Sequence, residues 1–113
     1  MLDNLFQYTF HGEGAHVVLN PQHSIFEGHF PERAVLPGVC QVWIVRRIAS
    51  QMAGRELRCQ SVKEVKFLSP ILPQEVQELD VRVKLTPQDA GVQVQASLWV
   101  GEQTMMKIRA TYI

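Results

Sequence analysis

The chain has few of the features that mark specialised classes of protein. Its two cysteines, Cys40 and Cys59, are far apart, so neither a disulfide framework nor a cysteine-based metal site is indicated. Lysine plus arginine equals aspartate plus glutamate at 11 each, which leaves no basic excess for a nucleic-acid partner. No apolar run approaches the ~18–20 residues that a membrane-spanning helix needs. Repeats and low-complexity segments are also absent from the sequence.

The first ten residues, MLDNLFQYTF, lack a basic region and carry an early aspartate, which is unlike a secretion signal. We therefore expect a cytoplasmic protein with free, packed thiols. A length of 113 residues suits a single domain, 1–113, with little room for insertions. Neither a cofactor nor a metal ion is expected, and neither a membrane nor a nucleic acid is an expected partner.

The longest regular segment is a helix predicted over Val39–Ala53. It contains no Pro or Gly, begins after Leu36-Pro37-Gly38 and stops before Gly54, a common residue at helix ends. Its first two turns are apolar almost all round, which predicts a buried helix and not one lying on a surface.

Short segments, most of them with alternating apolar and polar residues, flank this helix. After it, a turn is expected at Thr86–Gly91. The expected strands are Leu5–Phe10, His16–Leu19, a long and bulged Leu57–Leu68, Val76–Leu85, Val92–Val100 and Met105–Ile113. The last three form a meander, so the pattern predicts an α+β fold in which a curved antiparallel sheet wraps one central helix.

Two motifs carry a family resemblance. Gly28-His29-Phe30-Pro31, followed nine residues after the histidine by Gly38 of an LPGV sequence, resembles the signature of the β-hydroxyacyl thioester dehydratases (FabA/FabZ-like) of the hotdog fold. The block VKFLSPILP at 65–73 resembles the K-F-x-x-P stretch of the same enzymes. The resemblance implies a hotdog domain that dehydrates 3-hydroxyacyl thioesters of acyl carrier protein or coenzyme A, in fatty acid, polyketide or polyene synthesis.

The same resemblance identifies candidate site residues. His29 is the expected catalytic residue, since imidazole suits proton transfer near neutral pH, although a lone histidine can also simply be packed. Gly38 is expected to hold the thioester carbonyl through its backbone N–H, at the positive end of the helix dipole. It could equally be only a turn glycine. The other predicted substrate-binding residues are Phe30, Val39, Gln41 and Trp43.

Trp43 departs from the family pattern. The family has a Glu or Asp on the helix fourteen residues after its histidine, and often a Gln four residues later, where this chain has Trp43 and Arg47. An indole cannot act as an acid or base, and Trp43 could be a core residue. The second proton-transfer group is therefore open. The alternatives are Glu27, Glu32, a bound water and Gln41, which lies in a PGV-x-Q pattern similar to that of dehydratases of polyene-type pigment pathways.

Three functions follow as alternatives: a dehydratase, a non-catalytic acyl-thioester-binding or partner subunit, and a hotdog thioesterase. The resemblance implies a homodimer or higher oligomer, and a heterodimer with a paralogue would supply the missing carboxylate. His11, His16 and His23 are expected to be strand and turn residues. The densest basic set is either a solvated face or a docking patch for an acidic carrier protein. It consists of Arg46, Arg47, Arg55, Lys63 and Lys66.

Overall fold

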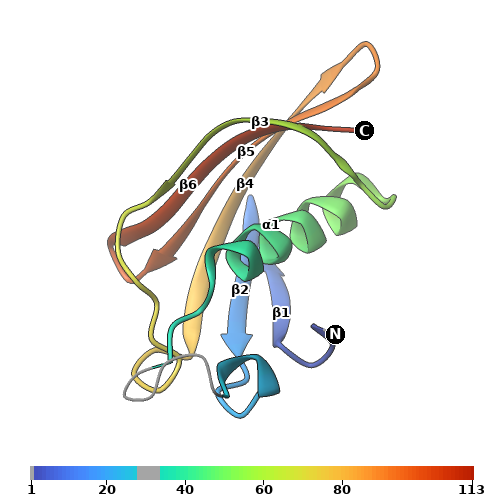
Figure 1. Ribbon diagram of the computed structural model, residues 1–113. Helices are drawn as coiled ribbons and strands as arrows, with labels where there is room; N and C mark the ends of the chain where they lie inside the picture. The colour runs from blue at the N-terminus through green and yellow to red at the C-terminus, as the bar shows by residue number, and fades with distance from the viewer. Residues whose placement is uncertain (1, 28–33) are drawn as a thin grey trace.

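One curved sheet and one long helix make up the described chain (Figure 1). The computed structural model describes residues 2–27 and 34–113. In chain order, the elements are β1 (Phe6–His11), β2 (Gly14–Leu19), the 3-10 turn η1 (Ser24–Phe26), α1 (Gly38–Ala53), β3 (Cys59–Phe67), β4 (Glu78–Gln88), β5 (Gly91–Val100) and β6 (Gln103–Tyr112). The strands form an antiparallel sheet in the order β1-β2-β4-β5-β6-β3, with α1 lying across its concave face. The predicted α+β arrangement is confirmed.

Helix α1 begins at Gly38, one residue before the predicted start, and ends as predicted at Ala53. Pro37 precedes it with extended backbone angles, and Gly54 ends it with φ of 72°, a left-handed conformation that glycine adopts without strain. The buried side chains form one stripe along the helix. They are Cys40, Gln41, Ile44, Val45, Ile48, Ala49 and Ser50. The prediction of burial all round is wrong for the first turn, because the sheet covers only one side of the helix and Val39 stays 75% exposed.

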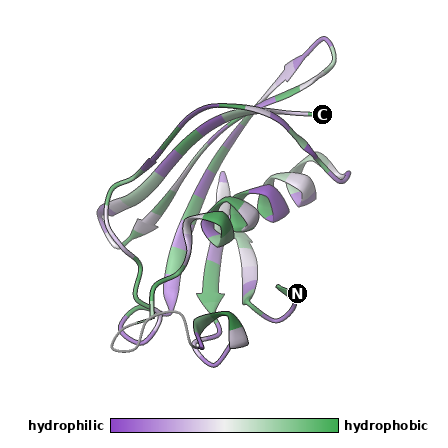
Figure 2. Ribbon diagram, in the orientation of Figure 1, coloured by the Kyte–Doolittle hydropathy of each residue, from purple (hydrophilic) through white to green (hydrophobic). Residues whose placement is uncertain are grey.

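The meander β4-β5-β6 shows the predicted alternation. Buried apolar residues alternate with more exposed residues along β5. The alternation of apolar and polar residues along the strands gives them the banded colouring of Figure 2. The predicted turn at Thr86–Gly91 is wrong in its extent, because β4 runs on to Gln88 and only Asp89 and Ala90 form the turn. Pro87 fits in this strand because β2 pairs only with Glu78–Arg82, so the end of β4 has one free side.

Strands β1 and β3 are the two edges of the sheet. The predicted bulges in β3 are present between Cys59 and Ser61 and between Val62 and Glu64, where its register to β6 shifts. Every residue of β3 is exposed in the single chain. No described helix is long and apolar enough to cross a membrane.

Candidate active site

The N-terminus of α1 presents backbone donors that have no acceptor in the described part of the chain. Pro37, the residue before the helix, makes no side-chain cap, and its carbonyl accepts the N–H groups of Cys40 and Gln41 at 3.0 and 3.1 Å. Within 2–27 and 34–113, the N–H groups of Gly38 and Val39 donate to no acceptor. Together with the helix dipole, these two donors favour a negatively charged or strongly polarised oxygen at this position.

Gln41 supplies an acceptor one turn into the helix. Its side chain is only 3% exposed, and its Nε2 donates to the carbonyl of Leu36 at 3.1 Å. This bond fixes the orientation of the amide, because a carbonyl oxygen can only accept. The Oε1 atom is buried and has no partner among the described residues. Leaving such an acceptor unpaired costs about 1–3 kcal/mol, so a ligand or water that donates to it would be stabilised.

The two sequence motifs pack against each other at this point. The ring of Phe67, from the second motif, lies over Gly38, from the first, so closely that a Cβ on Gly38 would stand 2.7 Å from Cζ of Phe67. The N–H of Leu36 also donates to the carbonyl of Ile71 at 2.8 Å. Phe67 is 50% exposed and was not among the predicted site residues. Its place in the KF motif was the available signal, but its contact with Gly38 depends on the pairing of β3 with β6.

Trp43 lies on a different side of α1 from this contact. Five residues separate it from Gly38, which corresponds to about 140° around a helix. Its ring meets that of Phe6 on β1 edge to face, with centroids 5.6 Å apart, and Arg47 lies 5.7 Å from the ring centroid. Trp43 thus packs toward β1, and a role in binding substrate stays a prediction.

Three of the candidate residues lie outside the described residues. They are His29, Phe30 and Glu32, so their predicted roles stay predictions. Glu27 is described, and its exposed side chain follows η1 directly.

His23 ties the segment before residues 28–33 to the start of the chain. Its Nδ1 accepts the N–H of Ile25 at 3.0 Å, so the proton is on Nε2, which donates to the carbonyl of Asp3 at 2.9 Å. The ring is 8% exposed. This bonding pattern is structural, and the described residues contain no group of three His, Cys, Asp or Glu that could hold a metal ion.

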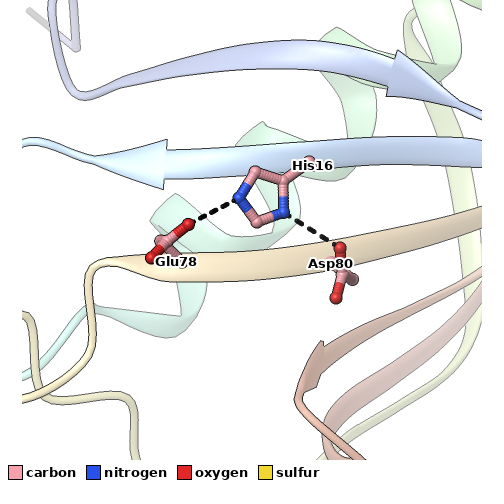
Figure 3. A network of polar contacts seen from close by, with 3 residues as sticks. All are labelled: His16, Glu78 and Asp80. Carbon is pink, nitrogen blue, oxygen red and sulfur yellow. Dashed lines mark hydrogen bonds and ion pairs between the residues drawn. The ribbon is translucent and has the colours of Figure 1, made fainter.

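His16 bridges two carboxylates on the face of the sheet away from α1 (Figure 3). Its Nδ1 lies 3.1 Å from Oδ1 of Asp80, and its Nε2 lies 2.9 Å from Oε1 of Glu78. The hydrogen bond with Asp80, followed by that with Glu78, raises the pKa of His16 above its ordinary 6.5. As predicted, it is a strand residue, and it links β2 to β4.

We expect this link to make stability depend on pH. Because the folded state raises the pKa of His16, the stabilisation is fully present below pH 6.5 and is lost as the pH rises through the folded pKa. The side chain is 40% exposed, so solvent screening limits the effect to about 1 kcal/mol at most. Thermal unfolding should therefore show His16→Gln less stable than wild type in mild acid and equal to it in mild alkali. A deficit that is the same at both pH values would contradict this expectation, and Glu78→Gln with Asp80→Asn should remove the pH dependence.

The predicted basic set does not form one surface. Arg46 donates to the carbonyl of Leu57 at 2.6 Å and to Glu56 at 3.1 Å, so it fastens the end of α1 to the segment leading into β3. Arg46, Arg47 and Arg55 surround a hollow beside the C-terminal half of α1. Lys66 pairs with Lys107 in the sheet and points away from α1. The sequence did not show that Lys66 lies apart from the three arginines, because its position depends on the register in which β3 pairs with β6.

Solved structures show the class of this fold. The chain superimposes on an uncharacterised protein from Erwinia carotovora subsp. atroseptica with a TM-score of 0.65 and 23% identity, covering 95% of this chain and 90% of that one. It superimposes on a chain of the dehydratase heterocomplex ApeI:P from Xenorhabdus doucetiae with a TM-score of 0.67 and 22% identity, covering 94% and 93%. The fold is a hotdog fold, as the resemblance implied.

The sequence comparisons then define the family. The family model described as ApeI dehydratase, of the ApeI-like family, matches residues 12–105, and the chain belongs to this family of FabZ-like hotdog dehydratases. The 3-hydroxyacyl-[acyl-carrier-protein] dehydratase FabZ of Lactiplantibacillus plantarum is 28% identical over 97 residues, which are 80% of this chain and 65% of that protein. FabZ of Acidiphilium cryptum is 33% identical over 67 residues, which are 51% of this chain and 41% of that protein. The chain thus spans less than two thirds of either relative.

Proposed function

We propose that this protein interconverts 3-hydroxyacyl and trans-2-enoyl thioesters, releasing water in the dehydration direction. The observation that carries the proposal is the N-terminus of α1, where the N–H groups of Gly38 and Val39 and the Oε1 of Gln41 lie on the same first turn and have no hydrogen-bond partner among the described residues. A 3-hydroxyacyl thioester matches this set, because its carbonyl accepts hydrogen bonds and its hydroxyl donates one. Membership of a dehydratase family supports the same assignment.

The proposed reaction needs one proton transfer out of the substrate and one back. His29 takes a proton from C2, and the charge that develops on the thioester oxygen is stabilised by the N–H of Gly38 and the dipole of α1. Gln41 holds the 3-hydroxyl through Oε1. The C3–O bond then breaks, the C2–C3 double bond forms, and the departing oxygen takes the proton from His29 to leave as water. The reaction involves no oxidation and consumes no further reactant.

The substrate is proposed to be carried on an acyl carrier protein. The support is that both curated relatives are named 3-hydroxyacyl-[acyl-carrier-protein] dehydratases. Coenzyme A thioesters share the reacting atoms and are the alternative.

The experiment is to mix the purified protein with a trans-2-enoyl thioester, on carrier protein and on coenzyme A, and to follow the loss of conjugated absorbance. Hydration to the 3-hydroxyacyl thioester is expected, and mass spectrometry identifies the product. Release of free thiol would instead identify a thioesterase. Absence of turnover on short and long chains, with either carrier, would contradict a dehydratase that acts alone.

A second candidate function is that of a partner subunit in a dehydratase heterodimer. The observation favouring it is Trp43, which stands where the family has its acid and packs against Phe6. One similar structure is that of the dehydratase heterocomplex ApeI:P. In this case a paralogue bearing the carboxylate would restore turnover when mixed with this chain.

We propose that assembly uses the free edge of β3. One side of this strand has no neighbour in the sheet, and apolar side chains on and just after it are exposed in the single chain: Val62 (47%), Val65 (38%), Phe67 (50%) and Leu68 (50%). A second β3 placed antiparallel about a two-fold axis between Lys63 and Glu64 sets each lysine opposite a glutamate. The same register sets Val62 opposite Val65, so the edge is complementary to itself.

Charge reversal tests this register. Lys63→Glu and Glu64→Lys should each weaken the dimer, because two like-charged pairs would then face each other, and the double variant should regain it. Sedimentation velocity over a dilution series measures the three dissociation constants. If the wild type is a monomer at micromolar concentration, or if the double variant is no tighter than the singles, the self-paired edge is wrong.

A further inference from the structure

A basic surface lies on the side of the sheet that faces away from α1. On β4, Val81 and Val83 are buried in the core beneath α1, so Arg82 and Lys84 point to the opposite side. On β6, Ile108 and Ala110 are buried in the same way. Lys107 and Arg109 therefore face outward with the two cations of β4.

The register of the sheet arranges these cations as a rectangle. Arg82 and Lys107 pair with Ser97 from either side, and Lys84 and Arg109 pair with Gln95. The cations of β4 are two strand spacings from those of β6, which is about 10 Å. The two cations on the same strand are two residues apart, which is about 7 Å. In the described chain none of the four cations forms an ion pair, although the whole sequence has no net charge.

These residues surround a groove of about 460 Å³ that runs across the strands. Glu13, beside the start of β2, and Glu64, on β3, are at its two ends, with the cation pairs between them. The charge along the groove therefore changes from negative to positive and back to negative. Only uncharged side chains, Gln95 and Ser97, lie at its centre.

The floor of the groove is held in place before any partner binds. The guanidinium of Arg82 lies 4.1 Å from the ring centroid of Trp99, a cation–π contact. The indole Nε1 of Trp99 donates to Oγ of Ser97 at 2.8 Å. One cation and the aromatic ring thus have defined positions, which reduces the entropy lost on binding.

We propose that this groove docks an acidic segment of a partner protein. The segment would present two groups of carboxylates about 10 Å apart, which is the span of three extended residues, with basic residues outside them to meet Glu13 and Glu64. A compact polyphosphate fits less well, because Arg82 already covers a face of Trp99 and carboxylates close both ends. An anionic membrane fits less well because the exposed carboxylates of Glu78 and Asp80 lie on the same face.

A pair of labelled peptides tests the proposal. The first peptide carries two pairs of glutamates, with the pairs placed three residues apart and lysines outside them at both ends. The second peptide has every glutamate replaced by lysine and every lysine by glutamate. Fluorescence anisotropy at low salt should show the whole protein binding the first peptide at least about tenfold more tightly than the second, with affinity falling as salt is added.

The variant Lys107→Glu with Arg109→Glu should lose at least about tenfold in affinity for the first peptide. Arg55→Glu with Arg58→Glu makes the same change in net charge at two exposed positions elsewhere and should bind like wild type. Circular dichroism and the unfolding temperature show that each variant is folded. Equal losses in both variants would overturn the groove as the site. If tripolyphosphate at a matched concentration displaces the first peptide, the proposal of a peptide segment is overturned. If the wild type self-associates and the variant Lys107→Glu with Arg109→Glu does not, the face binds a second copy of this chain and the proposal is also overturned.

Discussion

Replacing His29 by alanine is expected to lower the rate of enoyl-thioester hydration by about 10²–10⁴-fold, the usual contribution of a positioned general acid–base. In the proposed mechanism the same imidazole removes the C2 proton and returns it to the leaving oxygen. No described residue of the site offers a second group that titrates near neutral pH. The loss should therefore appear in kcat with little change in the unfolding temperature.

The matched control for this variant is His11→Ala. His11 lies at the exposed end of β1 and has no part in the proposed site, so its loss should leave turnover within about twofold of wild type. Steady-state kinetics of hydration measures both variants. If His29→Ala keeps wild-type activity, the catalytic assignment is wrong, and if both variants lose activity equally, the effect is not specific to the motif.

Replacing Gln41 by methionine is expected to separate activity from stability. Methionine has similar length and is apolar, so the variant removes the buried, unpaired Oε1 while filling nearly the same volume. The loss of the bond to Leu36 offsets this gain, and the unfolding temperature should change little. Hydration should fall by about 10–100-fold, because a hydrogen bond to the 3-hydroxyl is worth roughly 1.4–2.8 kcal/mol in the proposed transition state.

Ser50→Ala is expected to give the opposite result, a loss of stability with no loss of activity. Ser50 is also a buried polar residue of α1, but it lies near the other end, where its Oγ accepts the N–H of Leu57 at 3.0 Å. Its removal should cost about 1–3 kcal/mol in unfolding free energy and leave kcat/KM unchanged. Chemical denaturation and kinetics on both variants give the comparison. A Gln41→Met protein that is as active as wild type would remove Gln41 from the proposed site.

The parts of this fold that follow from local pattern were predictable. The limits of α1 follow from Pro37 and Gly54, and the meander follows from period-two alternation over residues 76–113. The extent of the β4-β5 turn was not predictable, because Pro87 suggested an early end to the strand. It is tolerated only because β2 leaves that part of β4 unpaired, which is a property of the sheet.

The arrangement of the site depends on contacts between residues far apart in the chain, so less of it could be predicted from the sequence. The motifs identified Gly38 and Gln41, but the contact of Phe67 with Gly38 requires β3 to pair with β6 in one register. The orientation of the Gln41 amide, whose Oε1 has no partner within residues 2–27 and 34–113, depends on the position of the Leu36 carbonyl. The helical period gives the side of α1 on which Trp43 lies, but its contact with Phe6, a residue of the first strand, could not be read from the sequence.

The order of strands in the sheet has a consequence for how the chain folds. Strands β4, β5 and β6 are consecutive in sequence and adjacent in space, so their pairing closes only short loops. In contrast, β2 reaches β4 across the whole of α1, and β3 reaches β6 across the meander. The C-terminal meander can therefore form first and offer its apolar face to α1, whereas the edge that carries Phe67 against Gly38 is completed late.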